Sequence, residues 1–154
     1  MDVNPEGTTM IVVDASRVVH FFDIMLLHKT REFRLPHDHK FLAYDYLYDM
    51  FALKQRHQLT FLRTLNAFEA STSYADNAVI SVLCVCRELS AAFIGLEDGR
   101  IRCHRWPPID PADFINNYTE VEVFRWNVEK IRLSPDRKTM YAASRFGNLC
   151  TLEL

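Results

Sequence analysis

The chain has 154 residues, of which 49% are hydrophobic and 25% charged, and its formal net charge is -2. This apolar content is enough for a core of domain size, which excludes a disordered chain. A charge near zero leaves no excess of basic residues to neutralise a phosphate backbone, so we expect no binding to nucleic acid.

Targeting and redox features predict an intracellular protein without membrane insertion. The first residues are acidic and no apolar segment of the secretory type follows them. The longest apolar run, residues 18–27, is interrupted by His20 and Asp23 and is too short to cross a bilayer. Four cysteines are too few for a disulfide framework, which agrees with a reducing compartment.

A unit of forty to fifty residues recurs along the chain, a period typical of propellers and solenoids. A polar turn followed by a short apolar run appears at 4–13, 86–95 and 134–143, with a weaker copy at 44–53. When the units are aligned, one column contains Met10, Met50, Ala92 and Met140, at steps of 40, 42 and 48 residues. The column one place on contains Ile11, Phe51, Phe93 and Tyr141.

Each unit continues through a second turn into an alternating run, which is typical of a half-buried strand. Further apolar runs precede or follow these pairs and bring a complete unit to four strands. In chain order the strand-forming segments are 4–13, 16–23 and 30–35, then 41–44, 44–53 and 56–63, then 79–86, 86–95, 98–105 and 120–124, and finally 128–133, 134–143 and 146–153. Asp98-Gly99 is a hairpin signal, because glycine adopts positive φ without steric cost, and Gly147 occupies the same column.

Helices fit these segments less well. The runs 18–22 and 78–85 are dense in β-branched and aromatic residues and are soon followed by turns, as strands are. One segment stays open, because 42–68 has neither Gly nor Pro and 44–51 could form a helical turn or two.

Both chain ends are expected to fall inside a unit. Only three residues precede the first turn, so we expect the first unit to lack its innermost strand, and the last unit to lack its outermost strand after Leu154. Four blades are at the lower limit for closing a propeller, and the end faces of an open array stay exposed. We therefore expect an all-β chain forming one domain, a partial β-propeller of about four degenerate four-stranded blades that is incomplete at both ends and joins the remaining blades of a longer chain. The approximate blades are 1–36, 37–77, 78–125 and 126–154.

The repeat resembles the WD40 repeat. Ser134-Pro135-Asp136 matches its first turn, Asp98-Gly99 its second, and Phe22-Asp23 stands at the place of its Trp-Asp pair. The Gly-His pair that often opens such a blade is absent, so the buried Asp-His-Ser-Trp network of many WD40 blades is not expected and packing should hold the blades together. The resemblance implies a WD40-like propeller that binds other proteins and is not an enzyme.

A closer resemblance, to the cilia- and flagella-associated WD-repeat proteins, covers about a third of the chain. It rests on segment 95–107, with its Leu-Glu-Asp-Gly turn, Ile-Arg-Cys strand and Trp-Pro exit, and on 131–136 and 141–144. It implies a scaffold in the axoneme of a cilium or flagellum that docks inner dynein arm or doublet-microtubule complexes. Two alternatives stay open: a generic intracellular WD40 adaptor in signalling or ubiquitin ligation, and a propeller hydrolase.

Two clusters of residue types that bind metals occur in the sequence. Cys84, Cys86, Cys103, His104 and Cys150 lie on neighbouring units, but Cys-x-Cys lacks the spacing of ordinary zinc sites, and cysteine is frequent in β cores. The segment 37–39, His-Asp-His, lies in a connecting loop where polar residues are ordinary. No nucleophile has a recognisable base beside it, and no phosphate-binding or dinucleotide glycine pattern occurs. We therefore expect no catalytic residue, metal or cofactor.

The loop 107–118 is longer than a blade connection needs and contains three prolines. Phe114, Ile115 and Tyr118 supply apolar surface without an assigned core position, so this loop is the candidate partner contact. The alternative is that the loop folds back on its own blade. Trp106 and Trp126 flank it and are expected on strands, in the core.

Overall fold

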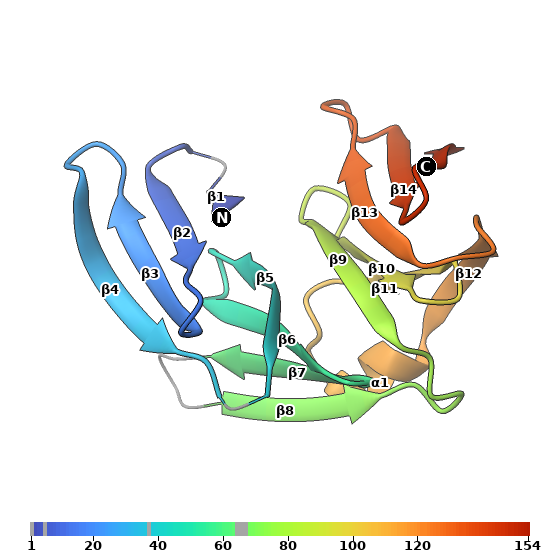
Figure 1. The fold of residues 1–154 in the computed structure, drawn as a ribbon, viewed down its shortest axis with the longest axis horizontal. Coiled ribbons are helices and arrows are strands. Elements are labelled where there is room, and N and C mark those ends of the chain that lie inside the picture. Colours follow the sequence, from blue (N-terminus) through green and yellow to red (C-terminus); the bar gives the residue numbers. More distant parts are fainter. Residues whose placement is uncertain (1, 5, 37, 64–67) are drawn as a thin grey trace. The chain divides into compact units, whose positions relative to one another are not determined.

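The structure is a computed structural model that describes residues 2–4, 6–36, 38–63 and 68–154. These residues form fifteen strands in four sheets and one short helix, and Figure 1 shows their course. The first sheet contains β1 (Asp2–Val3), β2 (Thr9–Val13), β3 (Val18–Asp23) and β4 (His28–Arg34), and the second contains β5 (Lys40–Asp45), β6 (Met50–Gln55), β7 (Gln58–Arg63) and β8 (Phe68–Ser73). The third contains β9 (Ile80–Cys86), β10 (Ala91–Leu96), β11 (Arg100–Arg105) and β12 (Tyr118–Glu122), and the fourth β13 (Val128–Leu133), β14 (Thr139–Ser144) and β15 (Leu149–Glu153).

The strands of each sheet follow one another in chain order, as in successive hairpins. The aligned column of the repeat lies on the second strand of every sheet, because Met10, Met50, Ala92 and Met140 belong to β2, β6, β10 and β14. The local pattern of turn, apolar run, turn and alternating run therefore placed the strand pairs correctly. By their contacts the residues divide into two compact units, 1–41 and 42–154, with the boundary inside β5.

The first sheet contains a strand that we did not predict from the sequence. Residues 2–3 form β1, which pairs antiparallel with β2 through Asp2↔Ile11 and Val3↔Met10. The expectation that the first blade lacks its innermost strand is therefore wrong, because two residues suffice for this pairing. Ile11, Val19 and Phe21 are buried, while most of β4 is exposed.

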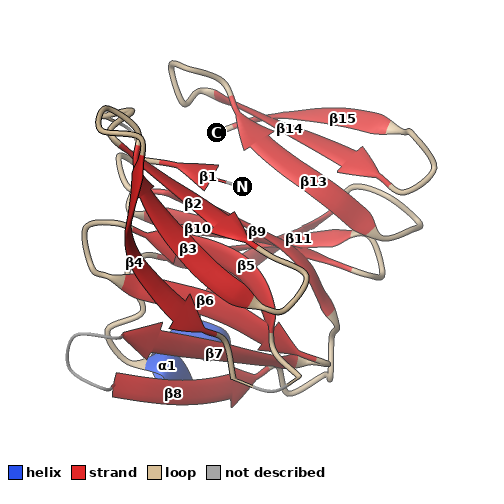
Figure 2. Cartoon of the chain, turned by 60° about the vertical axis from the view of Figure 1, so that its left-hand side comes forward, coloured by secondary structure: helices blue, strands red, loops and turns tan. Residues whose placement is uncertain are grey.

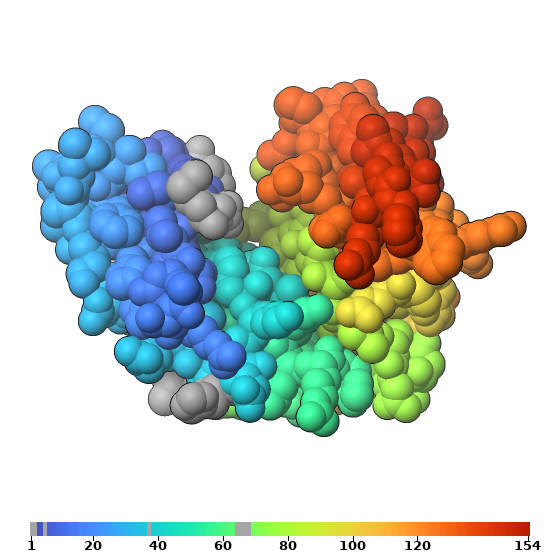
Figure 3. All heavy atoms as spheres, in the orientation of Figure 1, coloured from blue at the N-terminus to red at the C-terminus, as the bar shows by residue number. Residues whose placement is uncertain are grey.

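In the second unit the third sheet lies between the second and fourth sheets. Successive residues of a strand point to opposite faces, and every residue of β10 is buried. Ala92 and Ile94 pack in a core with Phe61 of the second sheet, whereas Phe93 packs in another core with Val128 of the fourth. The space-filling view shows the fourth sheet (orange to red) directly against the third (Figure 3).

The fourth sheet has three strands among the described residues, which agrees with the expectation that its outermost strand is missing.

The segment left open at 44–51 is not helical. It is the end of β5, a turn, and the start of β6, with Asp45 Oδ1 accepting the backbone N–H groups of Leu47 and Tyr48. Pairing of β6 with β7 along six residue pairs favours the strand.

Helix α1 (Pro111–Asn116) was not predicted. Asp110 caps it by accepting the backbone N–H of Ala112, and Pro111 suits the first turn because its missing N–H would have no partner there. The helix contacts β8 and β11, and Figure 2 shows it beside β8. Within the described ranges, no helix has the length and apolar character needed to cross a membrane.

Candidate functional site

The three residues proposed for partner contact divide between the core and the surface. Phe114 and Ile115, both on α1, are only 5% and 4% exposed, and Phe114 packs edge-to-face on Phe61 with ring centroids 5.2 Å apart. The loop thus folds back on its own blade, as in the alternative interpretation, since Phe114 packs on His104 and Trp106, but it also packs on Phe61 of the second sheet. Tyr118 begins β12 and is partly exposed, so a partner contact there stays a prediction.

Tyr118 belongs to a cluster centred on the buried guanidinium of Arg102. That group lies over the rings of Tyr74, at 4.1 Å, and Tyr118, at 4.4 Å. Its charge is paired with Asp76 Oδ2 and with Glu120 Oε2, each at 2.5 Å. A buried cation is stable only when it is paired and hydrogen-bonded in this way. The cluster therefore fastens the loop after β8 to β11 and β12.

Arg100 continues the cluster toward solvent. It bonds both carboxylate oxygens of Glu120, at 3.0 and 3.1 Å, and reaches Asp76 and Asp98. The hydrogen bond from Arg102, assisted by Arg100, lowers the pKa of Asp76 to about 2. All these charges are satisfied within the cluster, which fits a structural role.

His104 is buried beside Arg102 and has a defined tautomer. Its Nδ1 lies 2.7 Å from the Phe114 carbonyl oxygen, which can only accept, so Nδ1 bears the proton. The Tyr74 hydroxyl therefore donates to Nε2, at 2.6 Å. Burial lowers the pKa of His104 to about 4 and raises the pKa of Tyr74. Both ring nitrogens are engaged, so this histidine is not placed as a free base.

A second buried polar network joins Asp45, Arg87 and Trp106. Asp45 Oδ2 accepts a 2.7 Å hydrogen bond from Trp106 Nε1, and Asp45 Oδ1 pairs with Arg87 at 2.6 Å. We expected packing alone to hold the blades together, and this network corrects that expectation. The Trp-Pro pair was visible in the sequence, but nothing local pairs Trp106 with an aspartate in another blade.

The cysteines line the core between the third and fourth sheets. Cys86 is buried there, and Cys84, Cys103 and Cys150 pack against the same cluster. Within residues 2–4, 6–36, 38–63 and 68–154, no group of three or more His, Cys, Asp or Glu side chains is placed to hold a metal ion. His37 lies outside the described residues.

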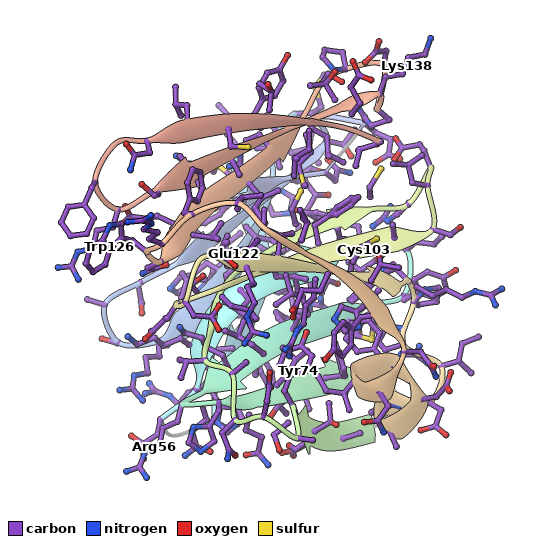
Figure 4. The ribbon with its side chains drawn as sticks, turned by 90° about the vertical axis from the view of Figure 1, so that its right-hand side faces the viewer. Arg56, Tyr74, Cys103, Glu122, Trp126 and Lys138 are labelled. Atoms are coloured by element: carbon purple, nitrogen blue, oxygen red, sulfur yellow. The ribbon has the colours of Figure 1, made fainter. Side chains whose placement is uncertain are left out.

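An exposed group of side chains lies where the loop 123–127 meets the turn 145–148. We expected Trp126 on a strand and in the core, and this expectation is wrong. The residue lies in a bend and is 55% exposed (Figure 4). Its ring meets that of Phe146, itself 66% exposed, at a centroid distance of 5.3 Å and an angle of 70°. Exposed arginines, Arg125 and Arg145, directly precede the two aromatic residues. These four side chains form a candidate partner surface of the second unit.

No family model matches the chain, and no curated protein matches it. Solved structures do match. The β-propeller domain of Myceliophteria thermophila Cps50 (Swd1) has a TM-score of 0.73 at 10% identity, with 99% of this chain and 52% of that chain covered. A structure of the mitotic checkpoint complex has a TM-score of 0.66 at 12% identity, with coverage of 99% and 47%. The chain spans about half the length of these structures. Their likeness establishes the fold, a partial WD40-like β-propeller, which confirms the prediction from the repeat.

Proposed function

We propose that the chain is part of a non-enzymatic scaffold that binds other proteins. The observation that carries this proposal is the propeller fold, in which packed sheets hold their connecting loops in fixed positions. One of the matching structures is by its title a protein complex, the mitotic checkpoint complex. Two buried polar residues of the second unit also support the proposal. Both ring nitrogens of His104 are hydrogen-bonded and Arg102 is ion-paired, so neither side chain is placed to act on a substrate.

As the finer form of this proposal, the scaffold docks inner dynein arm or doublet-microtubule complexes in a cilium or flagellum. It is supported by the sequence resemblance of segment 95–107. Several residues of this segment also have structural roles, since Arg102 and Trp106 hold the networks described above. A generic intracellular adaptor fits the fold equally well, and an experiment must separate the two.

The test is co-sedimentation of the 154-residue chain with salt-washed axonemal doublets, compared with microtubules polymerised from purified tubulin. The ciliary proposal expects the chain to pellet with the doublets in a saturable manner and more weakly with the bare microtubules. Equal pelleting with both, or with neither, contradicts the ciliary proposal.

A further inference from the structure

We infer that the loop surface, defined as Arg125, Trp126, Arg145, Phe146 and Leu149, binds a short acidic peptide segment with an apolar side chain in a partner protein. This inference rests on the proposed scaffold function and names the chemistry of its partner. All five residues belong to the second unit and lie on the loop between β12 and β13, on the turn between β14 and β15, or at the start of β15.

Two of the three apolar side chains of the loop surface are in contact. Trp126 and Phe146 touch one another edge to face, and Leu149, three residues after Phe146, is 80% exposed. Single exposed apolar residues are normal, whereas neighbouring ones mark interaction sites. Tryptophan and arginine are also the residue types that most often dominate binding energy in interfaces.

The charged part of the loop surface has no ion-pair partner among residues 2–4, 6–36, 38–63 and 68–154. Arg125 and Arg145 form no ion pair with any residue that the structure describes. At least one ion pair is formed by each of four other arginines of the same unit, namely Arg87, Arg100, Arg102 and Arg137. A guanidinium binds a carboxylate through two parallel hydrogen bonds. Two exposed arginines, each next in sequence to an exposed ring, therefore complement a peptide that alternates carboxylates with an apolar anchor.

The backbone below the loop surface is fixed by hydrogen bonds. Gly99 O accepts the N–H groups of Val123 and Phe124, each at 3.1 Å, and Arg145 N donates to Asn127 O at 3.2 Å. The side chain of Phe124 is buried in the core between the third and fourth sheets. A surface held in this way loses little conformational entropy on binding, which favours a specific site.

The surroundings favour a peptide over a nucleic acid. Exposed Glu122 and Glu129 flank the 123–127 loop in sequence, and the whole chain has a net charge of -2. Tracking a phosphate backbone needs more positive charge than two arginines supply against these carboxylates. An acidic peptide can place one or two carboxylates on the arginines and leave the glutamates in solvent.

The test starts with a phage-displayed library of random peptides of about twelve residues, selected on the 154-residue chain. The expected consensus contains Asp or Glu next to Trp, Phe or Leu. Binding of a labelled consensus peptide is then measured by fluorescence anisotropy, and it should weaken as NaCl is raised from about 50 to 300 mM. Because Trp106 is buried, protection of Trp126 from a quencher reports whether the peptide covers this surface.

Matched variants locate the binding site. The double variant Arg125→Glu, Arg145→Glu and the single variant Trp126→Ala should each raise the Kd of the consensus peptide by about tenfold or more. The control is Arg132→Glu, Lys138→Glu, which makes the same change in net charge, and it should leave the Kd within about twofold. Lys138 lies in the turn at the opposite end of β14 from Phe146 (Figure 4). Circular dichroism of each variant must match that of the parent chain.

Three results would overturn the inference. They are a selection without any consensus, a consensus peptide that binds the double variant as well as the parent chain, and a single-stranded oligouridylate that protects Trp126 when the peptide does not. In each case doublet binding in the sedimentation assay would still support the scaffold. Conversely, peptide binding at the loop surface without doublet binding would count against the ciliary role alone.

Discussion

Trp106 donates its indole N–H to Asp45 across 61 residues of sequence, at 2.7 Å. The carboxylate of Asp45 is wholly buried and is neutralised on its other oxygen by Arg87. The same side chain also accepts the backbone N–H groups of Leu47 and Tyr48. A single carboxylate therefore stabilises the turn after β5 and joins it to the third sheet at two places. Arg87 lies in the turn between β9 and β10, and Trp106 directly follows β11.

Substitution Asp45→Ala is expected to lower the free energy of unfolding by about 3 kcal/mol, because it leaves the indole N–H and the Arg87 charge without their buried partner. The measurement is urea unfolding of the 154-residue chain. Asp136→Ala is the matched control, since Asp136 also accepts a turn N–H, that of Lys138, but is exposed. Its expected loss is much smaller, because an exposed turn N–H is hydrogen-bonded by water once the carboxylate is removed. Equal losses for the two variants would contradict a special role for Asp45.

The local parts of the fold were predictable because their causes are local. Asp98-Gly99 forms its turn through the positive φ of Gly99, and Met50 and Met140 lie at the start of strands because polar turns precede them. Periodicity within one segment determines these features. The recurring turns also predicted that each sheet is formed by consecutive strands of one repeat.

The remaining features depend on contacts between segments far apart in sequence. Asp110 and Pro111 are ordinary helix-start residues, but Phe114 is buried only because β7 and β11 supply Phe61 and His104 to receive it. Trp126 was expected on a strand, yet β12 ends at Glu122 and the chain then turns over Gly99. No periodicity within one segment specifies either outcome.

The buried histidine predicts a pH dependence of stability. His104 has a pKa of about 4 in the folded chain because burial disfavours its charged form, whereas the ordinary value is 6.5. Between these values the unfolded chain binds more protons, so the free energy of unfolding should fall by about 3 kcal/mol as pH falls from 6.5 to 4. Above 6.5 and below 4 this residue contributes no further change.

The measurement is urea unfolding at several pH values between 4.5 and 7.5. His104→Gln should flatten the pH dependence in this window, and His57→Gln, at an exposed position in a turn, should retain it. Asp76 does not interfere, because its pKa of about 2 confines its loss of stabilisation to pH values below its ordinary 3.8. A His104→Gln variant with the parental slope would refute the assignment.

Two glycines at equivalent turns should respond differently to substitution. Both have positive φ, 90° at Gly99 and 80° at Gly147. A Cβ at Gly99 would lie 2.0 Å from the Phe124 carbonyl oxygen, whereas one at Gly147 would meet nothing within 4 Å. Gly147→Ala should therefore lower the free energy of unfolding by about 1–2 kcal/mol, the penalty for a left-handed conformation alone. Gly99→Ala should lower it considerably more, because the new Cβ would also clash with the backbone. Thermal unfolding of both variants checks this, and similar melting temperatures would contradict it.

The folding of the 107–118 loop can be tested by truncating its side chains. Phe114→Ala removes a ring that packs on Phe61, Trp106 and His104, and should lower the free energy of unfolding by about 3–5 kcal/mol. Ile109→Ala, in the same loop but almost fully exposed, should change it by less than about 0.5 kcal/mol. If Phe114 instead served a partner, its replacement would leave stability unchanged.

The two tryptophans offer a test of the charge at the loop surface. Trp126 is 55% exposed and Trp106 only 2%, so a quencher in solvent should act almost entirely on Trp126. Because Arg125 directly precedes Trp126 and Arg145 directly precedes Phe146, the ratio of iodide to caesium quenching at low salt should exceed the ratio for free N-acetyltryptophanamide, and added NaCl should reduce the excess. The Arg125→Glu, Arg145→Glu variant should bring the ratio below that of the free compound, and Trp126→Phe should abolish most quenching by either ion. A ratio in the parent chain equal to that of the free compound would mean that the arginines do not concentrate anions at the ring, and acidic peptides would then have no electrostatic reason to bind there.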